Sequence, residues 1–516
     1  MINKNKIRVR NFILFFLVAL GASLRFYQLS FFDLWYDEVY SVIGANNLAY
    51  FLRIFAYRYQ PPLYYMILHL WINLFGDGEF VIRSLSSFFG SASIPFVFII
   101  GKKFYNNYVG LISALIFTIC PLHIWYAQEA RMYSLSVFFS LVMVFMFLKS
   151  VDLKRGFAWW FLIAVVSIIN IYLNYFTVLL LLPIIIFIAG RKKISFSRLI
   201  FLLSLIILFL LPFTFFFYKQ FSLIRRMFWL DSPQFYAIPI SLGNFLLGYN
   251  ASFGQFSAAI ILISLAIIIW LFMFNSKGKD SLLLSYSILP LILLFFAGKY
   301  LAPVYLSRYL IIFSPFFYIL ISSLIMKTKC KKIFCLFLSF LIILMSFSLF
   351  NYYQGKIVAP LRFHHGVPAK KSFDKAIDII KDNILPGDLI AHSHVSTIPS
   401  FLYYFKDSPL NQIYLTIPEE QKDEYWRRRY SLDKIIAINK GYLNEGQYGY
   451  SCYIFGKEKK YYNFRMWLIS SNWLRNGILG EHATAVRKRA MRRFKKIRSF
   501  YRDGIYVDLY DLKKAD

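Results

Sequence analysis

The chain has 516 residues, of which 59% are hydrophobic and only 16% are charged. Soluble globular proteins carry about 25% charged residues, so this composition excludes an ordinary soluble domain and indicates an integral membrane protein. A formal net charge of +32 would suggest nucleic acid as a partner of a soluble protein, but many of these basic residues lie in short loops between apolar runs.

Apolar segments of membrane-spanning length recur along the first 350 residues. A helix needs about 20 apolar residues to cross about 30 Å of hydrocarbon. Loops rich in Lys and Arg face the cytoplasm, which assigns six basic clusters and the N-terminus to that side. The alternation predicts eleven transmembrane helices, at residues 12–32, 80–100, 108–126, 132–148, 157–173, 175–190, 198–217, 255–274, 281–297, 309–326 and 333–350.

Two segments of this region need a separate interpretation. Residues 61–75 open with two prolines and are too short to span comfortably, so they predict a helix lying at the membrane interface. The first apolar run follows four basic residues, as a signal peptide does, but it continues past the small residues of a cleavage site and favours a retained span.

The composition changes after residue 350. Of the 58 basic residues 29 lie there, together with 17 of the 26 acids. Alternating patterns predict a small α/β domain with a helix at 372–384, strands at 388–392, 466–470 and 504–512, and a basic helix at 483–501. We therefore expect a transmembrane domain at 1–350 and an extracytoplasmic domain at 351–516.

Acidic residues are scarce in the membrane half, so elimination narrows the catalytic candidates. The predicted topology places Asp152 and Asp280 in cytoplasmic loops. Asp77 and Glu79 fit a solvated turn before the second span, and Asp231 in a longer outer loop is ambiguous.

Asp37 and Glu38 follow Leu34-Trp35-Tyr36, where the first span leaves the membrane. Adjacent carboxylates among aromatic residues at an interface are costly to desolvate, which favours a functional role over an ordinary helix-end pair. Glu129 and Arg131 share a short outer turn. They either pair locally or face the same outer cavity as Asp37, with Arg131 supporting an anionic ligand.

Four motifs, in this order, carry a resemblance to a known family: Trp35-Tyr36-Asp37-Glu38, Gln60-Pro61-Pro62-Leu63-Tyr64-Tyr65 with His69, Gln128-Glu129-Ala130-Arg131-Met132-Tyr133, and Ser307-Arg308-Tyr309-Leu310. From residue 1 to about 350 the chain resembles the bacterial and archaeal membrane glycosyltransferases related to protein O-mannosyltransferases and to the aminoarabinose transferase of lipid A, a family 39-like group.

The resemblance implies a GT-C fold, which is an all-α polytopic membrane bundle with interfacial helices in its first outer loop. It also implies a sugar donor linked to a lipid phosphate. Asp37, the first acid of the pair with Glu38, becomes the expected catalytic base. Glu129 takes the position of the second outer-loop acid.

The chain departs from the aminoarabinose enzymes at Gln60-Pro61-Pro62, where those enzymes have Glu-Lys-Pro. The lysine that contacts donor phosphate there has no equivalent, which argues against aminoarabinose as the sugar. Phosphate binding then falls to Arg308, Arg131 or Lys299, and Gln60, His69 and Tyr133 are further substrate-binding candidates.

The predicted reaction is an inverting transfer from a polyprenyl-phosphate sugar to an acceptor hydroxyl on the outer side of the cytoplasmic membrane. The acceptor is a glycan, a glycolipid or a protein, and nucleic acid is excluded as a partner because the basic C-terminal segment is outside. The sequence predicts no metal site and no required cofactor, although a divalent metal is compatible with the chemistry. A flippase for lipid-linked sugars, a polymerase using a diphosphate-linked oligosaccharide and a scaffold with a degenerate site are the alternatives.

Overall fold

The computed structural model describes residues 4–48, 60–152, 156–190, 196–227, 232–272, 279–327, 331–356, 374–385, 388–392, 401, 403–404, 412–416, 450–454, 465–471, 487–488, 490–492, 494–502 and 505–514. The chain forms two compact units. The helical unit contains Met1–Leu29 and Phe55–Gly366, and the mixed unit contains Ser30–Ile54 and Val367–Asp516.

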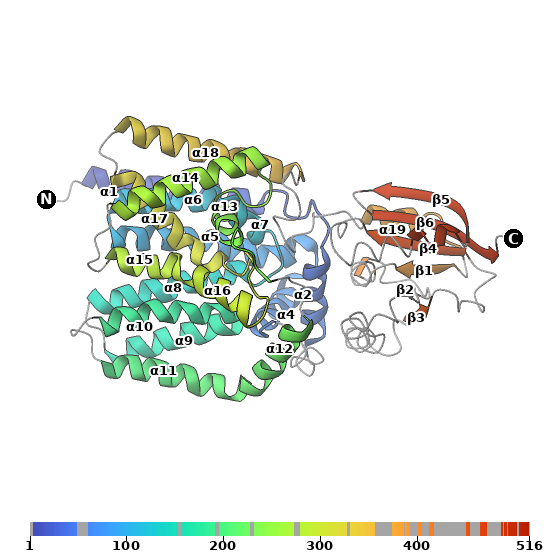
Figure 1. Cartoon of the computed structure of the whole chain (residues 1–516), viewed down its shortest axis with the longest axis horizontal. Coiled ribbons are helices and arrows are strands. Elements are labelled where there is room, and N and C mark those ends of the chain that lie inside the picture. Colours follow the sequence, from blue (N-terminus) through green and yellow to red (C-terminus); the bar gives the residue numbers. More distant parts are fainter. Residues whose placement is uncertain are drawn as a thin grey trace. The chain divides into compact units, whose positions relative to one another are not determined.

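The helical unit is a bundle of long apolar helices (Figure 1). Its elements are α1 Lys4–Phe26, α4 Leu63–Phe75, α5 Glu79–Phe104, α6 Asn107–Ile119, α7 Pro121–Ala127, α8 Tyr133–Asp152, α9 Phe157–Leu173, η2 Tyr175–Leu180, α10 Leu181–Ala189, α11 Phe196–Leu210, η3 Leu211–Phe213, α12 Thr214–Met227, α13 Ala237–Leu247, α14 Phe253–Phe272, α15 Lys279–Ser287, α16 Leu289–Tyr300, η4 Ile311–Phe313, α17 Ser314–Lys327 and α18 Lys331–Tyr353.

Each predicted membrane helix coincides with one helix of the structure or with two or three consecutive helical elements. Within the described residues, six helices are long and apolar enough to cross a membrane, or seven if the bent pair α6–α7 counts as one. The count of eleven crossings stays a prediction, because helices such as α9 are shorter than a full span. The first span is shorter than expected, since α1 ends at Phe26 instead of residue 32.

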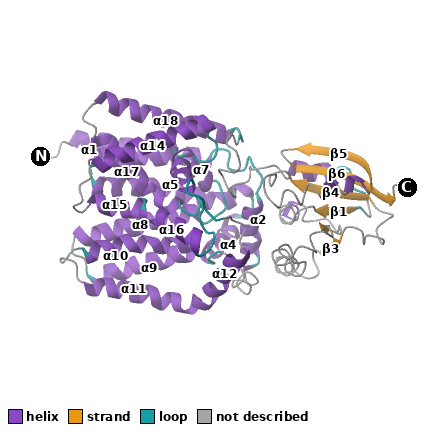
Figure 2. Cartoon of the chain, in the orientation of Figure 1, coloured by secondary structure: helices purple, strands orange, loops and turns teal. Residues whose placement is uncertain are grey.

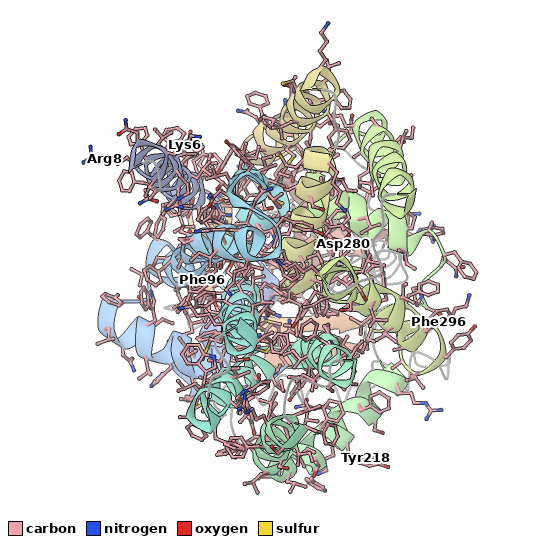
Figure 3. All side chains as sticks on the ribbon, turned by 90° about the vertical axis from the view of Figure 1, so that its left-hand side faces the viewer. Lys6, Arg8, Phe96, Tyr218, Asp280 and Phe296 are labelled. Atoms are coloured by element: carbon pink, nitrogen blue, oxygen red, sulfur yellow. The ribbon has the colours of Figure 1, made fainter. Side chains whose placement is uncertain are left out.

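Three of the basic clusters predicted to be cytoplasmic meet at one end of the bundle. Lys279 Nζ donates to the carbonyl of Lys103 at 3.4 Å, and Lys327 Nζ lies 3.2 Å from Asp280 Oδ2. The Tyr105 hydroxyl donates to the same carboxylate. Figure 3 shows Asp280 among the helices of the bundle. The three clusters therefore share one side, as the predicted topology requires.

The outer surface of the bundle carries large apolar side chains. Tyr218 is 72% exposed and Phe296 is 49% exposed, and both point away from the bundle in Figure 3. Because the composition already indicates a membrane protein, such residues fit a surface solvated by lipid.

The mixed unit holds all the strands that the structure describes (Figure 2). Its elements are α2 Tyr36–Asn46, α19 Asp374–Lys381, β1 Leu389–His392, β2 Gln412–Thr416, β3 Tyr450–Ile454, β4 Arg465–Ser471, β5 Phe494–Arg502 and β6 Ile505–Lys514. The strand order is β3-β2-β1-β4-β6-β5, with parallel pairs from β3 to β4 and antiparallel pairs from β4 to β5.

Alternation along β6 explains how the sheet packs. Ile505, Val507 and Leu509 are buried in one core with Ile377 and Ile380 of α19. Residues two apart on a strand share a face, so this face of β6 covers the helix. The α/β character predicted for this region is confirmed.

One predicted element of this region is wrong in part. The basic segment 483–501 was expected to be helical throughout, but residues 494–501 form most of β5. Lys and Arg are good helix formers, yet eight of the nine residues of β5 pair with β6 in an antiparallel ladder, and this long-range pairing overrides local propensity.

Candidate functional site

The turn at residues 128–132 is set up by a break in a helix. Pro121 disfavours helical backbone at the residue before it, and Cys120 is extended with φ −64° and ψ 117°. The chain then restarts as α7, which is bent by 57° from α6. Proline suits this first helical position because the N–H it lacks has no partner there.

Three serine hydroxyls fix the backbone around this turn. Ser86 and Ser87 of α5 lie 3.1 Å from the carbonyl of Arg131 and 2.8 Å from that of Ala127, respectively. Ser134 donates to the carbonyl of Tyr126 at 3.1 Å. The turn is therefore held from the side by α5 and from ahead by the first turn of α8.

The turn buries two side chains of opposite charge. Glu129 is 1% exposed and Arg131 is 2% exposed. Trp125 Nε1 donates to Glu129 Oε1 at 2.5 Å. Burying charges costs free energy unless they are paired and hydrogen-bonded, so such residues are candidates for function.

Aromatic side chains surround these charges. The ring of Tyr126 lies 4.7 Å from that of Tyr133, and its hydroxyl lies 2.9 Å from the hydroxyl of Tyr249. Trp125 contacts both Tyr249 and Tyr352, with ring centroids 5.5 and 5.2 Å apart. Tyr133, predicted as a substrate-binding residue, is thus part of an aromatic wall beside Glu129.

Arg308 belongs to the same neighbourhood. Its neighbour Ser307 lies 3.1 Å from the Ser241 hydroxyl and accepts from Asn244 Nδ2 at 3.0 Å, which ties this loop to α13. Burial raises the pKa of Tyr249, in the loop after α13. A hydrogen bond with Tyr126 and the charge of Arg308 lower that pKa, whereas the charge of Glu129 raises it. Both charges therefore act on one hydroxyl.

The predicted acid pair opens α2 in the mixed unit. Glu38 is fully buried, and its Oε2 accepts from the backbone N–H of Trp35 at 3.3 Å. This carboxylate therefore helps to cap its own helix. Asp37 is partly exposed, and its carbonyl accepts from the Ser41 hydroxyl at 3.0 Å. Of the two acids, Asp37 has the more accessible carboxylate.

The remaining candidates occupy other parts of the helical unit. Gln60 accepts from Tyr65 near the start of α4, and His69 Nε2 lies 3.0 Å from Asn73 Nδ2 one turn further along that helix. Lys299, at the end of α16, lies 4.2 Å from the ring centroid of Phe235. Their proposed contacts with substrate remain predictions.

Sequence reasoning missed several residues that build the turn. Arg25, Gln128, Tyr249 and Tyr352 are buried and hydrogen-bonded around it. Gln128 stood inside a recognised motif, but a neutral amide gives no charge signal. Among the described residues, no group of three or more His, Cys, Asp or Glu side chains is arranged to hold a metal ion.

Comparisons with known proteins identify the class of the fold. Residues 59–216 match the family model described as dolichyl-phosphate-mannose-protein mannosyltransferase. That segment contains Gln60, His69, Glu129, Arg131 and Tyr133. No curated protein sequence shows significant similarity to the chain.

Solved structures share the fold over nearly the whole chain. ArnT from Cupriavidus metallidurans in the apo state has a TM-score of 0.60 at 11% identity, over 96% of this chain and 97% of that chain. The same enzyme bound to undecaprenyl phosphate has a TM-score of 0.57 at 11% identity, with the same coverage. The oligosaccharyltransferase AglB from Archaeoglobus fulgidus, with an inhibitory peptide and a dolichol-phosphate, has a TM-score of 0.51 at 11% identity, over 98% of this chain and 74% of that chain.

The fold is that of the GT-C membrane glycosyltransferases. Residues 59–216, less than a third of the chain, also match the family model of a membrane sugar transferase.

Proposed function

We propose that the chain transfers a sugar from a polyprenyl-phosphate donor to an acceptor hydroxyl on the outer side of the cytoplasmic membrane. The observation that carries the proposal is the turn with buried Glu129 and Arg131, which lies inside the segment matching the mannosyltransferase family model. Support for the donor class comes from the fold neighbours, which bind undecaprenyl phosphate and a dolichol-phosphate.

Asp37 acts as the general base in this proposal. Its carboxylate accepts the proton of the acceptor hydroxyl as that oxygen attacks the anomeric carbon. The new glycosidic bond forms while the bond from the anomeric carbon to the phosphate oxygen breaks, and polyprenyl phosphate leaves. Attack opposite the leaving group inverts the anomeric centre.

Arg308 and Arg131 are the proposed stabilisers of the departing phosphate, with Lys299 as a further candidate. Fixed cations placed where negative charge develops lower the barrier without reorganisation. Glu129 keeps the site from carrying uncompensated positive charge before the donor arrives. The reaction needs no cofactor, and a divalent metal would add neutralising charge at the phosphate without changing these roles.

The decisive experiment supplies purified full-length protein in lipid nanodiscs with a radiolabelled polyprenyl-phosphate-mannose and, separately, the glucose and aminoarabinose analogues. Release of polyprenyl phosphate with sugar transfer or hydrolysis supports the proposal, and Asp37→Asn should abolish it while donor binding persists. Unchanged turnover in Asp37→Asn would remove Asp37 as the base.

A flippase is the competing function, and the same preparation tests it. Reconstituted vesicles would then move labelled donor across the bilayer with its sugar–phosphate bond intact. The position of Glu129 favours sugar transfer instead. Glu129 lies just before the start of α8, whereas Lys149, of a basic cluster assigned to the cytoplasm, lies in the last turn of that helix. This acid is therefore expected at the outer face, where transfer takes place. Translocation without cleavage of any tested donor would overturn the proposed transfer.

A further inference from the structure

The side chain of Gln128 joins the end of α1 to the turn that carries Glu129 and Arg131. Its Nε2 lies 2.6 Å from the carbonyl of Tyr27, 3.2 Å from that of Arg25 and 3.3 Å from that of Leu24. The last carbonyls of a helix have no partner within the helix, so this amide supplies donors that α1 lacks.

Arg25 makes a second connection, from α1 to the end of α6. Its guanidinium is fully buried and donates to the carbonyls of Phe117 and Thr118 at 3.0 and 3.1 Å. These carbonyls belong to the last turn of α6, where Pro121 breaks the helix. Arg25 of α1 thus caps the end of α6, whereas Gln128, which follows α7, caps the end of α1.

Hydroxyl groups add hydrogen bonds to the junction between the end of α1 and the turn at residues 128–132. The Tyr352 hydroxyl donates to Gln128 Oε1 at 2.5 Å, and Tyr353 donates to the carbonyl of Leu24 at 2.5 Å. The Ser87 hydroxyl lies 3.1 Å from the carbonyl of Arg25 and 2.8 Å from that of Ala127.

Close packing leaves the junction little freedom. A Cβ added at Gly90 of α5 would lie 2.9 Å from Ala127 Cβ and 3.2 Å from Arg25 Nε. The absence of a side chain at this position is what lets α5 approach both. A polar group buried in such a place is destabilising when it loses its partner, so the hydrogen bonds specify one arrangement.

We propose that Gln128 is a positioning residue of the transfer site, which fixes the backbone that presents Glu129 and Arg131 through its bonds to the end of α1 and to Tyr352. This inference rests on the proposed function. Gln128 acts through its neighbours and does not touch the reacting atoms. Its loss should therefore lower kcat more than it changes the KM for donor or acceptor.

The test compares Gln128→Leu with Gln255→Leu in full-length protein. Gln255 is a matched control, because its Oε1 also accepts a structural hydrogen bond, from the Ser252 N–H at 2.8 Å near the start of α14. We expect kcat per donor-binding site to fall about 10- to 100-fold in Gln128→Leu, as for other small misplacements of catalytic groups, with near-normal KM. Gln255→Leu should keep its kcat even if its Tm falls equally.

A double-mutant cycle separates positioning from general destabilisation. Tyr352→Phe removes only the hydroxyl that holds Gln128 Oε1, so it should lower kcat on its own and add little in the Gln128→Leu background. If the losses of kcat in the two single variants add up in the double variant, Gln128 and Tyr352 do not act through their shared hydrogen bond.

Hydrogen exchange tests, independently of activity, whether Gln128 holds the backbone of the turn. Amides of residues 124–133 should exchange faster in Gln128→Leu than in the wild type or in Gln255→Leu. A wild type without transfer would refute the proposed function and leave this readout intact. If the wild type is active and Gln128→Leu has the same kcat and the same amide exchange as the wild type, the inference is overturned.

Discussion

Trp125 and Glu129 are one helical turn apart, and the indole Nε1 of Trp125 donates to the Glu129 carboxylate at 2.5 Å. Trp125 lies in the last turn of α7, so the bend at Pro121 also aims this donor. Hydrogen bonds to charged groups contribute about 1.5–3 kcal/mol. The hydrogen bond thus fixes the position of the Glu129 side chain.

Trp125→Phe tests this relationship, because it keeps an aromatic ring and removes the donor. We expect kcat to fall roughly tenfold to a hundredfold, which corresponds to about 1.5–3 kcal/mol. Steady-state transfer with a labelled polyprenyl-phosphate sugar measures it. Glu129→Gln should lower kcat too, and Trp125→Phe should cost little more once Glu129 is replaced. An undiminished kcat in both single variants would show that the carboxylate has no part in transfer.

Gln28, in the turn two residues after α1, has a conformation that L-residues rarely adopt, with φ +53°. A residue with a Cβ in this region costs about 1–2 kcal/mol relative to right-handed backbone, and glycine avoids that cost. Gln28→Gly should therefore be more stable than Gln28→Ala by about 1 kcal/mol. Both variants remove the buried Oε1, so their difference isolates the backbone. Equal thermal unfolding midpoints in detergent would contradict the strain.

Asp280 tests the ion pair at the basic end of the bundle. Its carboxylate accepts from Tyr105 and pairs with Lys327 at 3.2 Å. Asp280→Asn keeps the size and removes the charge, so we expect a loss of about 1–3 kcal/mol in stability with unchanged KM for donor. Thermal unfolding and donor binding measure the two effects. A large change in donor affinity would mean that this end of the bundle communicates with the transfer site.

The helical architecture and the charged residues of the candidate site stand out in the sequence for one physical reason. Ionisable residues are expensive in a membrane, so Glu129 and Arg131 stand out against apolar neighbours. Arg25 and Gln128 did not stand out, because Arg25 looks like a residue at the end of a span and Gln128 carries no charge. Their role depends on carbonyls of residues about a hundred positions away, which no local pattern contains.

In the mixed unit, too, long-range contacts limit what the sequence predicts. The apolar residues Ile505, Val507 and Leu509 alternate with more polar ones and so predict β6, since a half-buried strand alternates apolar and polar side chains. Basic β5 resembled a helix because its strand character comes from pairing with β6. β2 and β3 were missed, and both pair in parallel with partners far along the chain.

Tyr404 links the C-terminal domain to the segment that carries the acid pair. Its hydroxyl accepts from the backbone N–H of Leu34 at 2.6 Å, and both residues belong to the mixed unit. Leu34 is three residues before Asp37, so this bond restrains the backbone leading to the proposed base. Tyr404→Phe removes only the acceptor oxygen.

We expect Tyr404→Phe to lower kcat about three- to tenfold, because a neutral hydrogen bond contributes about 0.5–1.5 kcal/mol. Transfer kinetics measure this loss, and Tyr403→Phe, one position away, is the matched control that should leave kcat unchanged. Hydrogen exchange at residues 33–38 should rise in Tyr404→Phe alone. Equal activity and equal exchange in the two variants would show that the C-terminal domain does not set the conformation of the acid pair, and its role would then have to be sought in acceptor binding.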